Sequence, residues 1–134
     1  MKTGRVIGAI VLAFIVADLV SFLWHGTLFQ SVYYMDPSAP IGNIPVLNAA
    51  ILLWTIGLAF FVLSNKYLPA KGSRLSRGTL VGLVFGVITI GFFNTLNSAL
   101  ISTWFDATAF FFDILYGAVV GTLSGLVLVS VAKR

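Results

Sequence analysis

The chain has few charged residues, no cysteine and no glutamate. Only 9% of its 134 residues are charged, whereas a soluble domain carries about a quarter. A water-soluble surface cannot be built from that composition. The absence of cysteine excludes a disulfide framework, a thiolate nucleophile and a thiolate metal site. The chain also lacks a nucleophile elbow and a glycine-rich loop after a strand, so we expect no enzyme and no cofactor.

Apolar residues make up 59% of the chain and form four runs. Each run is long enough to cross the hydrocarbon core of a bilayer, and backbone groups in lipid must bond internally, so each is a helix. We interpret the first run as an uncleaved span, because it is longer than a signal-peptide core and contains Asp18. The sequence predicts an all-α fold, a four-transmembrane-helix bundle of two helical hairpins, as one integral membrane domain over residues 1–134. The predicted spans cover about 4–24, 46–64, 78–101 and 112–132.

The basic residues predict how the chain is oriented in the membrane. All eight Lys and Arg residues precede the first span, lie between the second and third, or follow the fourth. The positive-inside rule makes that side cytoplasmic, which predicts an N-in, C-in, multi-pass protein of the inner (plasma) membrane. The net charge of +4 does not indicate nucleic-acid binding, because no basic face is interleaved with aromatics.

The outward-facing side is rich in aromatic residues. Residues 27–35 predict a short helix in the membrane interface, and the prolines that follow end it. We interpret the aromatic residues on this side as a belt at the headgroups rather than as a ligand cage. They are Trp24, Phe29, Tyr33, Tyr34, Trp104, Phe105 and residues 110–112.

Small residues recur at every fourth position in three of the spans. Such stripes let helix backbones approach closely in lipid. They serve either to pack one bundle together or to dock a second copy or a membrane-protein partner, and the sequence does not separate these uses. The stripes are Gly78, Gly82 and Gly86 in the third span, Gly117, Gly121 and Gly125 in the fourth, and Ala9, Ala13 and Ala17 in the first.

Polar residues gather in the outer half of the predicted bundle. Asp18 is an ionisable residue inside a span, which by default merits a functional hypothesis. Ser21 and His25 follow it on the same helical face. A polar pocket, open or nearly open to the outside, is therefore predicted. Its candidate residues are Asp18, Ser21, His25, Asn94, Asn97, Asp113 and Tyr116.

Three interpretations of this pocket remain open. In the first, the side chains only hydrogen-bond across helices and fix the packing. In the second, Asp18 binds a proton, a cation or a small ligand, with His25 as its pH-sensitive neighbour. In the third, Asp18, His25 and Asp113 bind a metal, although one histidine and two aspartates without close spacing are a weak signal, and we predict no metal.

Several short motifs also resemble small bacterial four-span membrane proteins of unknown function. The resemblance implies the four-helix layout and a shared polar set of Asp18, His25, Asn97 and Asp113, but no activity. The chain departs from the pattern at Phe93, where a relative carries an acid, and in the connection after Trp104. The motifs are Ala17-Asp18-Leu19, Trp24-His25-Gly26-x-Leu28 leading to Tyr33, Gly82-Leu83-Val84-Phe85-Gly86, residues 94–99, Trp104, and Asp113 with Tyr116-Gly117.

These observations favour two functions of different classes. The first, which the sequence favours, is a non-enzymatic accessory protein or complex subunit in the lipid bilayer, packing through its glycine stripes as a homo-oligomer or with a membrane-protein partner. The second is an ion- or small-ligand-handling transporter or channel built on the Asp18 pocket.

Overall fold

A computed structural model describes residues 3–33, 44–64, 73–100 and 106–132. Four helices of this part are long and apolar enough to cross a membrane, which confirms the predicted all-α four-helix bundle. The helices are α1 (Thr3–Leu23), the π-helical turn η1 (Trp24–Leu28), α2 (Gln30–Tyr33), α3 (Ile44–Leu63), α4 (Arg74–Leu100) and α5 (Ala107–Ala132).

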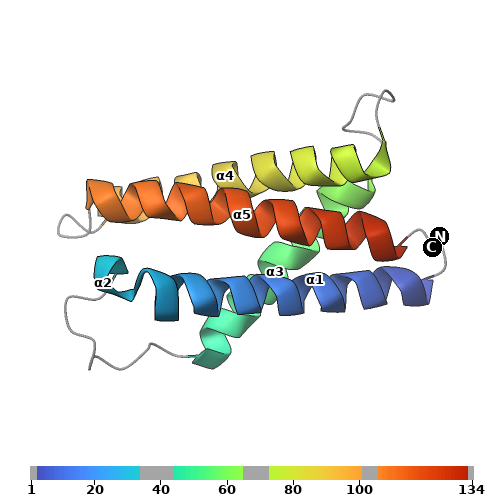
Figure 1. Cartoon of the computed structure of the whole chain (residues 1–134), viewed down its shortest axis with the longest axis horizontal. Coiled ribbons are helices and arrows are strands. Elements are labelled where there is room, and N and C mark those ends of the chain that lie inside the picture. Colours follow the sequence, from blue (N-terminus) through green and yellow to red (C-terminus); the bar gives the residue numbers. More distant parts are fainter. Residues whose placement is uncertain (1–2, 34–43, 65–72, 101–105, 133–134) are drawn as a thin grey trace.

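The long helices lie side by side, apart from α3, which crosses the others obliquely (Figure 1). The start of α1 and the end of α5 lie at the same end of the bundle, here called the termini end. The opposite end, where α1 passes into η1 and α5 begins, is called the His25 end. Arg5 near the start of α1, and Arg74 and Arg77 at the start of α4, lie at the termini end. Which membrane face each end meets remains a prediction.

Two helices begin earlier than hydropathy predicts, because polar caps extend them. α4 begins at Arg74 rather than near residue 78, and α5 at Ala107 rather than near 112. The Asp106 carboxylate accepts hydrogen bonds from the backbone N–H groups of Thr108, at 2.8 Å, and Ala109, at 3.4 Å. A side chain that satisfies the free N–H groups of a first turn stabilises the start of a helix. Hydropathy detects only the apolar part of each helix.

The first span continues beyond Trp24 as a wider turn. The backbone N–H of Phe29 donates to the Trp24 carbonyl at 3.0 Å, closing the five-residue spacing of a π-helix. The interfacial helix predicted over 27–35 is therefore a π turn followed by the one-turn α2. The predicted belt residues Tyr34, Trp104 and Phe105 lie outside the described residues.

The glycine stripes of α4 and α5 face each other. A Cβ atom added to Gly82 would collide with the Gly121 carbonyl oxygen, and one added to Gly121 would collide with that of Gly82. Gly86 and Gly117 form an equivalent pair. The two backbones touch directly, so no larger residue fits between them. Both stripes are therefore occupied inside this one chain.

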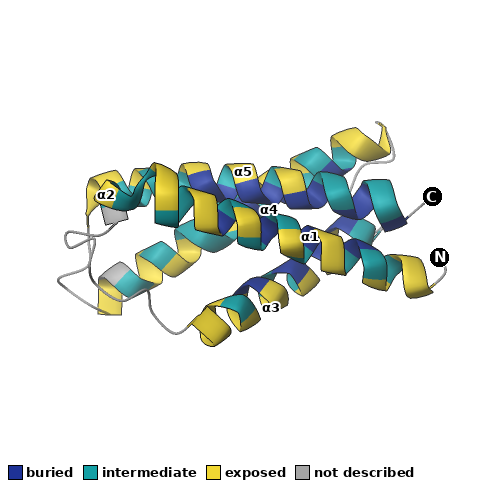
Figure 2. Ribbon diagram, turned by 60° about the horizontal axis from the view of Figure 1, so that its bottom comes forward, coloured by how far each residue is buried: buried dark blue, intermediate teal, exposed yellow. Residues whose placement is uncertain are grey.

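A neighbouring face of α5, about 100° around the helix from the glycine stripe, packs on the alanine stripe of α1. Ala9, Ala13 and Ala17 have no exposed surface, and they lie in the two apolar clusters that contain Leu128 and Val120 of α5. With α4 on one face and α1 on a neighbouring one, α5 is the most buried of the long helices (Figure 2). It is the central element of the bundle.

A polar contact and a short apolar face hold α3 to the bundle. The indole N–H of Trp54 donates to the Thr89 hydroxyl at 2.8 Å, and that hydroxyl donates to the Phe85 carbonyl at 2.7 Å. Leu58 and Ala59 are buried against the core. The remaining large apolar side chains on the outer faces of the helices are exposed, as lipid contact requires.

We expect Gly82→Ala to destabilise the bundle by about 1–3 kcal/mol, the usual effect of overpacking a tight interface. The added methyl would meet the Gly121 carbonyl, so the two helices would have to separate. Gly8→Ala is the matched control, because a Cβ atom there has nothing within 4 Å. Unfolding of both variants in a mixed detergent titration measures the difference, and equal stability would contradict the backbone contact.

Candidate functional site

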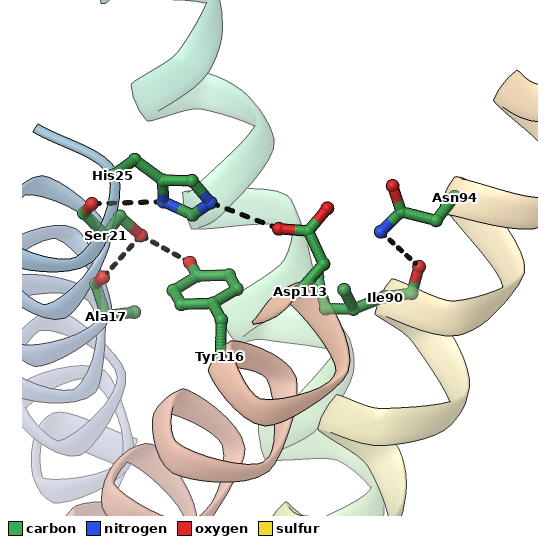
Figure 3. Close-up of polar contacts among 7 residues, drawn as sticks. All are labelled: Ala17, Ser21, His25, Ile90, Asn94, Asp113 and Tyr116. Carbon is green, nitrogen blue, oxygen red and sulfur yellow. Dashed lines mark hydrogen bonds and ion pairs between the residues drawn. The ribbon is translucent and has the colours of Figure 1, made fainter. Parts of the chain in front are cut away.

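Four polar side chains from two helices meet at the His25 end of the bundle (Figure 3). Ser21 and His25 come from the end of α1 and from η1, and Asp113 and Tyr116 come from the first three turns of α5. They are called the polar cluster below. All four are residues that the sequence predicts for the pocket, and the structure brings them into direct contact.

One hydrogen-bond chain links the two helices through hydroxyl groups. The Ser21 hydroxyl lies 2.7 Å from the Ala17 carbonyl and 2.5 Å from the Tyr116 hydroxyl. A carbonyl only accepts, so Ser21 donates its single proton to Ala17 and accepts the proton of Tyr116. Both side chains are at least nine-tenths buried, so their polar atoms are satisfied without bulk water. The donor and the acceptor of each of these two hydrogen bonds are therefore determined.

His25 connects the same two helices through its ring nitrogens. Nδ1 lies 3.2 Å from the Ser21 carbonyl oxygen, one turn back along the chain. Nε2 lies 3.4 Å from Oδ1 of Asp113, a long hydrogen bond that is within ion-pair distance when the ring is charged. The His25 and Asp113 side chains are 29% and 17% exposed, so the pair is partly open. The pair is therefore more exposed than Ser21 and Tyr116.

Aromatic rings enclose the cluster. The Tyr116 ring meets the imidazole of His25 edge-on at 4.7 Å, and the Trp24 ring lies 6.1 Å from Tyr116. Phe29 joins the two helices, with its ring 4.6 Å from Trp24 and 4.7 Å from Phe112. Such tilted and edge-on pairs add stabilisation beyond burial. Trp24, Phe29 and Phe112, which we predicted as belt residues, thus also pack around the polar cluster.

Helix register explains why these four residues meet. Ala17 is small and fully buried on the face of α1 that packs on α5, and Ser21 and then His25 follow it at spacings of four. On α5, Asp113 precedes Tyr116 by three residues, so both lie on one face. The π turn begins at Trp24, so His25 lies at the start of a locally widened segment. π turns of this kind occur frequently at functional sites.

The other predicted pocket residues lie around this cluster rather than in it. Asp18 is partly buried and makes no hydrogen bond or ion pair with the described residues, although its charge lies close enough to act on the Tyr116 hydroxyl. The Asn94 amide donates to the Ile90 carbonyl of its own helix at 3.2 Å, and Asn97 is partly buried on the same helix. The cluster is therefore centred on His25 and not on Asp18.

The described residues contain no group of three side chains that could hold a metal ion. Asp18, His25 and Asp113 do not come together as such a group. Two contributors to the architecture had no clear sequence signal: the π turn at Trp24–Leu28, and the Trp54–Thr89 bond. The Asp106 cap did have one, an aspartate immediately before an apolar run, which hydropathy alone overlooks.

The fold and the cluster define a multi-pass α-helical membrane protein with an ionisable site between two of its spans. Residues 6–130 match the family described as "Predicted membrane protein (DUF2177)", and the chain belongs to that family. This agrees with the resemblance to small membrane proteins of unknown function. No curated protein and no solved structure matches the chain.

We expect Tyr116→Phe to weaken the α1–α5 contact by about 0.6 kcal/mol, the average for an interhelical hydrogen bond in a membrane. The ring and its aromatic contacts stay, and only the proton donated to Ser21 is lost. A double-mutant cycle with Ser21→Ala isolates this interaction in unfolding titrations. Additive effects of the two substitutions would show that the hydroxyl groups are not coupled.

Proposed function

We propose that the protein handles a small ion or ligand at its His25 end, through the polar cluster of Ser21, His25, Asp113 and Tyr116. The observation that carries this proposal is the contact between the ionisable His25 and Asp113 across two membrane spans. Ionisable side chains are costly within a membrane and usually mark ion pathways, proton relays or binding sites. A purely structural contact would be made at lower cost by uncharged groups.

The charge distribution supports a cationic ligand. Asp18, Asp106 and Asp113 lie toward the His25 end, whereas the three described arginines lie at the termini end. No arginine or lysine therefore neutralises the carboxylates near the cluster within the described residues. Aromatic faces beside it, such as that of Trp24, add favourable sites for a cation. The cluster suits a positively charged species better than an anion.

The function favoured from the sequence, a non-enzymatic accessory protein or complex subunit docked through its glycine stripes, receives less support. A stripe that packs against the other stripe has no room for a partner helix, and both are occupied in this way. A homo-oligomer or a membrane-protein partner would have to use another face of the bundle. We propose the inner membrane as the location, with the His25 end facing outward, on the positive-inside argument.

Flux measurements in proteoliposomes test the proposed function. We expect a cation gradient of H⁺, Na⁺ or K⁺ to dissipate faster with the protein than in empty liposomes, and Asp113→Asn to remove the difference. Asp106→Asn is the matched control, because Asn is also a good helix cap and Asp106 is exposed outside the cluster. Asp18→Asn tests whether the neighbouring carboxylate also takes part.

No flux of any of the three cations in the wild-type protein would count against the proposal. A loss of flux in Asp106→Asn as large as in Asp113→Asn would also contradict it, because the effect would then not depend on the cluster.

A further inference from the structure

The contacts of His25 determine where its protons must be. Nδ1 faces the carbonyl oxygen of Ser21, which only accepts hydrogen bonds, so Nδ1 carries a hydrogen. In a neutral imidazole the other nitrogen then carries none and presents a lone pair. Here that nitrogen, Nε2, faces a carboxyl oxygen of Asp113. A neutral His25 beside an ionised Asp113 would place a lone pair against a negative charge.

One additional proton makes this contact favourable. Either His25 is an imidazolium that donates from Nε2, or Asp113 is a neutral acid that donates to Nε2. The two forms differ only in which atom holds the proton, and both give the pair a net charge of zero. Without that proton the pair carries a net charge of −1 and the Nε2–Asp113 contact becomes repulsive.

We propose that His25 and Asp113 form a binding site for a single proton, and that its release separates α5 from the end of α1 at the His25 end. This inference rests on the proposed function in that it names the ion handled there, a proton taken up from water on that side. The proton binds in the 3.4 Å contact between Nε2 and Oδ1. No bond other than N–H or O–H forms or breaks.

No neighbouring charged group among the described residues can take the place of this proton. On α1 the nearest other ionisable residue is Asp18, and on α5 it is Tyr116, whose proton is already donated to Ser21. α3 contributes no charged residue, and the charged residues of α4 are Arg74 and Arg77 at the termini end. No basic side chain among the described residues replaces the proton when it leaves. Among the residues that the structure describes, no basic side chain then offsets the repulsion.

The π turn is the segment that responds to proton release. The fully buried Ala9, Ala13 and Ala17 hold the rest of α1 against α5, whereas no residue of Trp24–Leu28 is fully buried. Beyond His25 this end is joined to α5 mainly by ring contacts such as Phe29 on Phe112. Movement on proton release is thus confined to the end of α1 that carries His25.

The experiment follows the α1–α5 separation as the pH is raised. The chain has no cysteine, so Leu28→Cys and Phe111→Cys, both at exposed positions, place two spin labels at the His25 end without further changes. In nanodiscs we expect a short, narrow distance distribution at low pH that becomes longer or broader in one step as the pH rises. Electron spin resonance measures this distribution.

Asp113→Asn is the decisive variant. Its amide donates to Nε2 of a neutral His25, and its carbonyl accepts from a charged one, so the contact forms without an added proton. We expect the pH step to disappear and the short distance to persist. His25→Gln, whose amide also donates to Asp113, is a second variant with the same expectation. Asp106→Asn should keep the wild-type step.

Nitrogen NMR reads the proton positions directly, because His25 is the one histidine of the chain. We expect a protonated Nδ1 at every pH. A neutral ring protonated only at Nε2, or a distance step that persists in Asp113→Asn, would overturn the inference. If the wild-type protein shows the pH-dependent distance step but no cation flux, the proposed function is refuted and the proton site is not. If it shows flux but no distance step, the proton site is refuted and the proposed function is not.

Discussion

The architecture depends on the direct contact between the backbones of α4 and α5. Hydrophobic burial does not drive helices together in lipid, so close packing and interhelical hydrogen bonds must do so. Gly82 and Gly121 bring each other's carbonyl groups to the position that a Cβ atom would occupy. This contact fixes both the rotation and the register of α5, because any other face would present side chains. The neighbouring face of α5, which carries Tyr116, Val120 and Leu128, is thereby committed to α1.

The position of the polar cluster follows from this commitment. The face of α5 that carries Tyr116, Val120 and Leu128 packs on α1, where the fully buried alanines allow close approach. At the His25 end the same close packing brings Ser21 within hydrogen-bond distance of Tyr116. One turn further out, the longer contact of His25 with Asp113 bridges the two helices. The polar cluster therefore depends on tight apolar packing between α1 and α5 in the rest of the interface.

Much of this could be predicted from the sequence, and the limits have physical causes. The four apolar runs predict the four helices, and the spacing of small and polar residues identifies the faces that pack and all four members of the cluster. The depth of a residue along a span does not show which way its side chain faces, so the sequence predicts a pocket centred on Asp18, whereas the structure centres it on His25. Asp18 follows Ala17, which faces α5, and a residue one position on is turned by about 100°. Nor does a stripe such as Gly82 and Gly86 reveal whether its partner helix belongs to the same chain.

The low polarity of the surroundings gives a single proton a large influence at the His25 end. Where the effective dielectric is low, a satisfied polar contact is stronger than in water and an unsatisfied one is more costly. The His25–Asp113 contact changes between these two conditions with one proton, whereas the Tyr116–Ser21–Ala17 chain beside it stays satisfied. A contact that does not depend on the added proton therefore lies next to one that does. The Tyr116–Ser21–Ala17 chain holds the helices in register, so that repulsion at His25 is converted into movement of the π turn rather than into unfolding.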